Sequence, residues 1–184
     1  MPILFITPQE IAQTTVMGGN VDVDKYNFII ESVQEGVIHS LLGTELYEKI
    51  VTEVGDLSIS GLYLEMYTKF IKPITKNEAL AEYIEVASLI VANGGIYKHA
   101  PENGESATEG EINALKEKYH QLSQKYINRF DKWICKNDIP EYKRYQDEVN
   151  ATKLTTRGGW YFGSSRSSGT YNDNLQCWLK SDEW

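Results

Sequence analysis

The segment from Thr108 to about Asn137 constrains the fold most strongly, because its apolar residues recur at every third or fourth position. This spacing places them along one side of an α-helix. Thr108 and Glu111 have the spacing of a capping box, which predicts that the helix begins there. The apolar residues of the stripe are Ile112, Leu115, Tyr119, Leu122, Tyr126, Phe130 and Trp133.

A helix of this length with one apolar side must bury that side against another part of a protein. The sequence allows two alternatives: the stripe packs into the core of its own chain, or it contacts a neighbouring subunit, and one stripe can do both. The candidates for a subunit interface are its four aromatic residues, Tyr119, Tyr126, Phe130 and Trp133.

The rest of the first 150 residues also has the pattern of helices. Thr7 and Pro8 are a typical capping residue and first helical residue, and Gly43 is a typical residue for a helix to end on. We expect the fourth helix to stop before Pro73, and we expect the apolar stretch 87–92 to form a central helix surrounded by others. The expected helices span about residues 8–17, 24–42, 44–54, 62–71, 77–97 and 108–137, with a short one near 141–150. The predicted fold is therefore an all-α helical bundle.

The character of the chain changes at Ala151. The segment from there to Trp184 is rich in Gly, Ser and aromatic residues and has neither helical nor strand periodicity. We therefore divide the chain into a helical domain, 1–150, and an extended C-terminal arm, 151–184. A disordered tail is one interpretation of such a segment. The aromatic and basic residues favour a docking arm instead, because aromatic anchors fill the pockets of a partner. The docking candidates are Arg157, Trp160, Tyr161, Phe162, Arg166, Tyr171 and Trp178.

Charge is distributed unevenly along the chain. The net charge is −8, but residues 1–110 carry −10 and residues 111–184 carry +2. An acidic body argues against broad binding of nucleic acids, and the few positive charges of the arm give little affinity for RNA. Opposite charges on one chain favour contacts between different patches of two copies, or docking on an acidic partner.

No motif of enzyme chemistry stands out. There is no phosphate-binding glycine loop and no HExxH pair, and we predict no catalytic residue, no cofactor and no metal site. His99 with Glu102 and Glu105 is more simply read as an exposed polar loop than as a metal site. The two cysteines, Cys135 and Cys177, are too few for a disulfide framework, so we expect reduced thiols. No apolar run reaches the roughly 20 residues of a membrane span.

One part of the sequence resembles a known family. A short helix introduced by Thr7-Pro8-Gln9-Glu10-Ile11, a helix opened by Asp24 and ending in Leu41-Leu42-Gly43, and the following Glu45-Leu46-Tyr47 resemble the head–tail connector (portal adaptor) proteins of tailed bacteriophages. The later pattern is similar to the versions from crAss-like phages: an Ala/Ile-rich helix, an acidic loop, and a long helix ending near Trp133 before Pro140. The resemblance covers about residues 3–145.

This resemblance implies a structural protein of the virion with no enzymatic activity. It implies a ring, dodecameric in related proteins, that lies below the portal, joins the capsid to the tail and extends the DNA channel. Its partners would be the portal protein, other copies of itself, further tail or ring proteins, and DNA that passes without specific binding; no membrane is involved. The protein would assemble in the host cytoplasm. The alternative from the residues alone is a cytosolic helical protein-interaction or regulatory module without catalytic activity.

Overall fold

The computed structural model describes residues 3–15, 23–87, 89–92, 95–98, 107–144, 169–172 and 177–180. Within these ranges the chain is an all-α bundle, as predicted, with two short β-hairpins added to it. The described helices are α1 Pro8–Thr14; α2 Val23–Val33, which continues through the π-helical turn η1 Gln34–Ile38 into α3 His39–Leu42; α4 Thr44–Gly55; α5 Gly61–Met66, which continues through the π-helical turn η2 Tyr67–Ile71 into α6 Lys72–Ala87; and α7 Glu109–Ile134.

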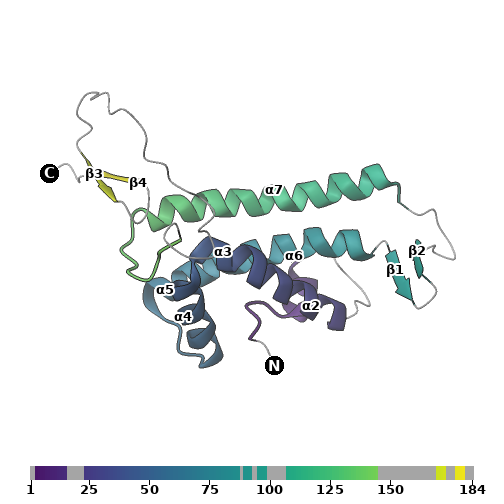
Figure 1. Ribbon diagram of the computed structural model, residues 1–184, viewed down its shortest axis with the longest axis horizontal. Helices are drawn as coiled ribbons and strands as arrows, with labels where there is room; N and C mark the ends of the chain where they lie inside the picture. The colour runs from purple at the N-terminus through teal and green to yellow at the C-terminus, as the bar shows by residue number, and fades with distance from the viewer. Residues whose placement is uncertain are drawn as a thin grey trace.

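Helices α6 and α7 lie side by side along the long axis of the molecule (Figure 1). They run in opposite directions, since Glu78 of α6 meets His120 of α7 and the later Glu85 meets the earlier Lys116. Helices α3, α4 and α5 gather at one end of this pair. Both helices of the pair contribute to two core regions, and each region is completed by other helices.

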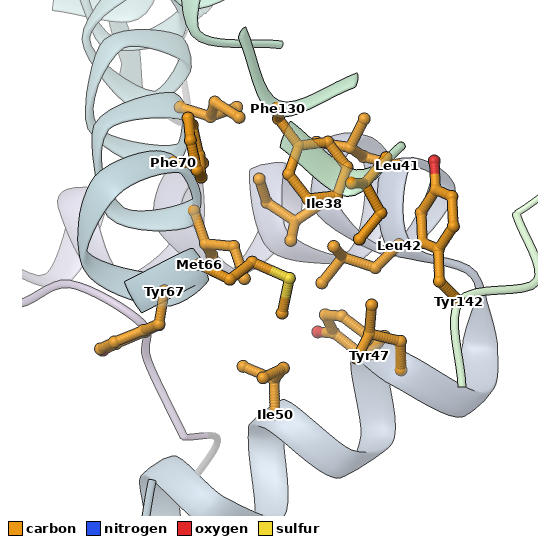
Figure 2. Packing of buried hydrophobic residues seen from close by; sticks show 14 of the residues in the cluster. Ile38, Leu41, Leu42, Tyr47, Ile50, Met66, Tyr67, Phe70, Phe130 and Tyr142 are labelled. Carbon is orange, nitrogen blue, oxygen red and sulfur yellow. The ribbon is translucent and has the colours of Figure 1, made fainter. Parts of the chain in front are cut away.

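The larger core region lies at the end where α7 finishes (Figure 2). Helices α3 and α4, the turn η2, the last turns of α7 and the segment after it all contribute residues. Figure 2 shows these side chains pointing toward one another from their separate helices. Its completely buried members are Ile38, Leu42, Leu46, Ile50, Met66, Ile71, Ile74 and Phe130.

The second core region lies between α1, α2, the middle of α6 and the first half of α7. Small residues of α6, Ala79 and Ala81, are buried there. Small side chains allow the neighbouring helices to approach closely. The central helix that the sequence predicts at residues 87–92 is not formed, since α6 ends at Ala87 and residues 89–92 are a strand; the buried small residues of α6 are Ala79 and Ala81.

The helix ends follow the capping chemistry of the sequence. Thr7 caps α1, its Oγ1 accepting a hydrogen bond from the Glu10 backbone N–H at 3.2 Å, and Pro8 is the first helical residue. The capping box of Thr108 and Glu111 at the start of α7 is complete. Gly43 separates α3 from α4 with φ 78° and ψ 159°, a conformation essentially restricted to glycine.

The segment that precedes α1 is held at the two π-helical turns. Gln34, the first residue of η1, accepts a hydrogen bond from the Phe5 N–H at 2.6 Å and donates one to the Ile3 carbonyl at 3.1 Å. Tyr67, the first residue of η2, donates its hydroxyl hydrogen to the Phe5 carbonyl at 2.6 Å. The backbone N–H and carbonyl of Phe5 are thus both satisfied by side chains, so this segment can be buried without regular secondary structure and the Phe5 ring enters the core.

The expected helix boundary at Pro73 is wrong, because α6 continues through it. Proline removes one backbone donor and its ring crowds the carbonyl four residues earlier. The widened turn η2 directly precedes this position, and the Lys72 N–H bonds to the Tyr67 carbonyl, five residues back. This turn shifts the local carbonyl spacing, which lets one helix span the two that the sequence predicts.

The expected helix over residues 77–97 is also wrong in its last third. Helix α6 ends at Ala87, and the strands β1 Leu89–Ala92 and β2 Gly95–Lys98 form an antiparallel pair. Ala92 pairs with Gly95, so only Asn93-Gly94 lie between the strands. Asn-Gly is the strongest short signal for a two-residue hairpin. The apolar run was ambiguous by itself, and this dipeptide decides against a helix.

Candidate functional site

Five of the predicted docking residues, Arg157, Trp160, Tyr161, Phe162 and Arg166, lie outside the described residues, as does the predicted domain boundary at residue 150. The other two lie in a hairpin. Strands β3 Gly169–Asn172 and β4 Cys177–Lys180 pair antiparallel, and Tyr171 is directly opposite Trp178. The sequence showed no strand periodicity there. This part of the arm therefore has regular structure that the sequence did not predict.

The segment that leads into the arm, residues 135–144, is fastened to the bundle; we call it the arm root. Ile139 and Tyr142 are buried in the larger core region, and the Tyr142 ring meets Phe130 edge to face at 5.8 Å. The short helix expected from residue 141 is absent over 141–144, where the chain is irregular. The reason is that the chain inserts Ile139 and Tyr142 into the core, which fixes its path.

Glu141 joins the arm root to two helices. Its Oε1 accepts a hydrogen bond from Lys49 of α4 at 2.5 Å, and its Oε2 accepts one from the Tyr63 hydroxyl of α5 at 2.7 Å. The Lys49 Nζ also lies 4.0 Å from the centre of the Tyr63 ring. Burial opposes the charge of Glu141, but the hydrogen bonds from Lys49 and Tyr63 outweigh it and hold the pKa of this carboxyl below its usual value. Glu141 is therefore ionised whenever the protein is folded at neutral pH.

Two further ion pairs secure the arm root. Lys143 pairs with Glu45 of α4, and Arg144 Nη1 lies 3.2 Å from Asp131 Oδ1 of α7. Burial raises the pKa of Asp131, and the charge of Arg144 opposes this shift. Consecutive residues are thus tied to different helices, so the arm root is held against the bundle up to residue 144. The sequence did not predict the roles of Glu141, Lys143 and Arg144. The only signal in this segment was Pro140, which indicated that a helix ends there.

Replacing Glu141 with Gln should lower the free energy of unfolding at pH 7 by about 1–2 kcal/mol, because a half-buried charged pair with Lys49 is lost. The native pKa is below the usual value of about 4.3. The contribution of Glu141 is therefore complete above that value and is lost as the pH falls through the native pKa. Urea unfolding should show a clear difference between variant and wild type at pH 7, and this difference should shrink as the pH is lowered through the native pKa of Glu141.

Glu65→Gln is the matched control, because Glu65 pairs with Lys69 on the surface of α5 and η2. Because water screens this exposed pair, the effect of this substitution should be much smaller than that of Glu141→Gln at neutral pH. Equal effects of the two substitutions would show that the Glu141 pair has no special part in fastening the arm root.

The four candidates for a subunit interface lie against the core of their own chain. Phe130 is completely buried and Tyr119 nearly so, while Tyr126 and Trp133 are partly buried and pack on the larger core region. Of the two alternatives that the sequence left open, the structure favours the core for Phe130 and Tyr119. Of the four, Tyr126 and Trp133 keep part of their side chains exposed.

Acidic residues of α6 face α7 at the other end of the helix pair. His120 Nδ1 lies 3.1 Å from the buried Glu78 carboxylate, and Lys116 pairs with Glu85. Burial raises the pKa of Glu82, which lies between them in sequence, and the charge of Glu78 raises it further. These contacts hold the two helices together.

No group of three His, Cys, Asp or Glu side chains is arranged for a metal ion in the described part of the chain. His99, Glu102 and Glu105 are outside it. The expectation of reduced thiols is wrong for Cys135, which is disulfide-bonded and packs against the larger core region. Among the described helices, none is both long enough and apolar enough to span a bilayer.

Comparisons with known proteins give one match. The model of DUF6712, a family of unknown function, matches residues 38–152, which begin at the end of η1 and include α3 to α7 and the arm root. No curated protein and no solved structure matches.

Proposed function

The chain belongs to DUF6712, whose function is unknown. From the resemblance of residues 3–145 to head–tail connector proteins, we propose that it is a structural subunit of a head–tail connector ring in a tailed-phage virion. The ring lies below the portal, joins the capsid to the tail and extends the DNA channel. The arm carries the docking residues that hold the portal or a neighbouring copy.

The observation that carries this proposal is the fastened arm root. Glu141, Lys143 and Arg144 are bound to α4, α5 and α7, and Tyr142 is buried between them. A docking arm works best when it leaves a rigid body in a fixed direction, because less freedom is then lost on binding. A tail without a function needs no such anchoring.

Two further features support the proposal. The elements that carry the resemblance have the expected form, since Thr7 caps α1 and Gly43 makes the sharp corner between α3 and α4. In addition, residues 1–110 have a net charge of −10. Acidic surfaces repel the phosphates of DNA, so a channel built from them lets DNA pass without holding it.

The test is deletion of residues 151–184. We expect the shortened protein to keep its helical circular dichroism spectrum and its cooperative unfolding, because both core regions lie before residue 145. We also expect it to stop joining the cognate portal in a co-sedimentation assay. Normal assembly of the shortened protein on the portal would contradict the proposed role of the arm.

Two controls make this result specific. Deletion of residues 181–184 alone should leave assembly intact, since it removes none of the docking candidates. The full-length Cys135→Ser variant separates loss of the arm from loss of the disulfide at Cys135. A wild-type protein that ignores the portal and works as a monomer or dimer would instead favour the helical regulatory module.

A further inference from the structure

The outer side of α7 carries a row of positive residues, which we call the basic stripe: Lys118, Lys125, Arg129, Lys132 and Lys136, the last just beyond the helix end. At about 100° per residue these five positions fall within roughly 80° of the helix circumference. All five side chains are exposed. The stripe is roughly 27 Å long at 1.5 Å per residue and runs beside the apolar side of α7, about 90° from it around the helix.

The charges of the basic stripe are not neutralised by other described residues. The lysines Lys49, Lys69, Lys72, Lys116 and Lys143 each form an ion pair with a carboxylate, and so does Arg144. In the same described ranges, no residue of the basic stripe does so; Arg129 lies over the Tyr126 ring at 5.5 Å. The one acid in this part of α7, Asp131, lies on another side of the helix and is engaged by Arg144.

A surface of the opposite sign lies on α2, η1 and α4. Glu31 and Glu35 are one turn apart, and both are exposed, as is Glu48 on α4. Burial and a hydrogen bond to Glu35 raise the pKa of Tyr47, and the charge of Glu31 adds to this shift. Glu31 and Glu35 therefore lie near the same residue of α4, the neighbour of Glu48 in the chain. We call Glu31, Glu35 and Glu48 the acidic face.

We propose that the basic stripe of one copy docks on the acidic face of the next. This inference rests on the proposed ring and names the surfaces through which its subunits meet. Two different patches make a heterologous contact, which can repeat from copy to copy until a ring closes. A second copy is favoured over nucleic acid as the occupant, because the chain has a net charge of −8 and presents the complementary surface itself.

The test uses two charge reversals with opposite signs. The stripe variant is Lys125→Glu/Lys132→Glu, and the face variant is Glu31→Lys/Glu48→Lys; none of these side chains makes an ion pair with a described residue, so folding should be preserved. Self-association at low salt is measured by concentration-dependent light scattering, which reports attraction even when no ring closes. Each variant alone should associate at least tenfold more weakly than the wild type.

An equimolar mixture of the two variants should recover the association, because a negative stripe then meets a positive face and a positive stripe meets a negative face. Lys76→Glu on α6 is the control for a charge reversal outside the stripe, since Lys76 makes no ion pair with a described residue, and this variant should associate as the wild type does. Raising the salt to about 0.5 M should weaken the wild-type attraction by screening. Absence of wild-type attraction, or failure of the mixture to recover it, would overturn the inference.

Two outcomes separate this inference from the proposed function. If the stripe variant assembles on the portal as well as the wild type, the docking surfaces are wrong while the connector role stands. If the mixture recovers self-association but the wild type never joins a portal, the surfaces are right and the connector role is wrong. Binding of a fluorescent DNA duplex that the stripe variant loses, with self-association unchanged, would show that the stripe is a nucleic-acid site instead.

Discussion

Phe130→Ala should lower the free energy of unfolding by about 3–5 kcal/mol, the usual cost of removing a fully buried aromatic ring. Phe130 is 0% exposed. Its ring meets Phe70 at 6.0 Å and Tyr142 at 5.8 Å, so it joins η2, α7 and the arm root in one contact group. Denaturant unfolding followed by circular dichroism at 222 nm measures the change.

Leu115→Ala is the control on the same apolar stripe. Leu115 is 40% exposed near the other end of α7, so its truncation should cost less than about 1 kcal/mol. Similar losses for both variants would mean that the stripe is buried evenly along its length. Protease sensitivity of the arm root should also rise in Phe130→Ala, because Tyr142 loses the ring it packs against.

Local chemistry explains why the helix boundaries could be predicted where they were. Thr7, Gly43 and the pair Thr108–Glu111 determine helix ends through interactions within a few residues. Such interactions do not depend on the rest of the fold, so the sequence contains them directly. The prediction of α7 from its apolar stripe is confirmed for a similar reason, since helical periodicity is also a local property.

Pro73 and the segment 89–98 show where local rules were insufficient. At Pro73, a π-helical turn lets the helix continue, and the packing of Tyr67, Phe70 and Ile71 in the core stabilises that turn. This is a tertiary effect that no residue pattern reveals. In residues 89–98 the apolar run fits either a helix or a strand, and the hairpin turn that Asn93-Gly94 favours decides for strands.

The arm root could not be predicted because its contacts join distant parts of the sequence. Lys49 and Glu141 are 92 positions apart, and Glu45 and Lys143 are 98 apart. The sequence shows many possible pairs of opposite charge and gives no way to choose among them. Similarly, the net charge of +2 over residues 111–184 is a property of the sequence, but only the structure shows which of these positive residues lie along α7 without an ion pair to a described residue.

Phe5→Ala should destabilise the protein about as strongly as Phe130→Ala, by about 3–5 kcal/mol. Phe5 is outside every helix and strand, yet it is only 1% exposed. Its ring meets Tyr47 of α4 at 5.7 Å and Tyr67 of η2 at 6.0 Å, both edge to face. Edge-to-face pairs add about 0.5–1.5 kcal/mol each beyond the buried area. The measurement is the same denaturant unfolding.

Phe28→Ala is the control, because Phe28 is 72% exposed on α2 and its loss should change stability by less than about 0.5 kcal/mol. The substitution at Phe5 keeps the backbone hydrogen bonds to Gln34 and Tyr67, so the loss measures the ring alone. If Phe5→Ala proved as mild as Phe28→Ala, the N-terminal segment would lie loosely on the bundle. The large expected loss follows because the Phe5 ring completes the core between α4 and η2, which the helices alone do not fill.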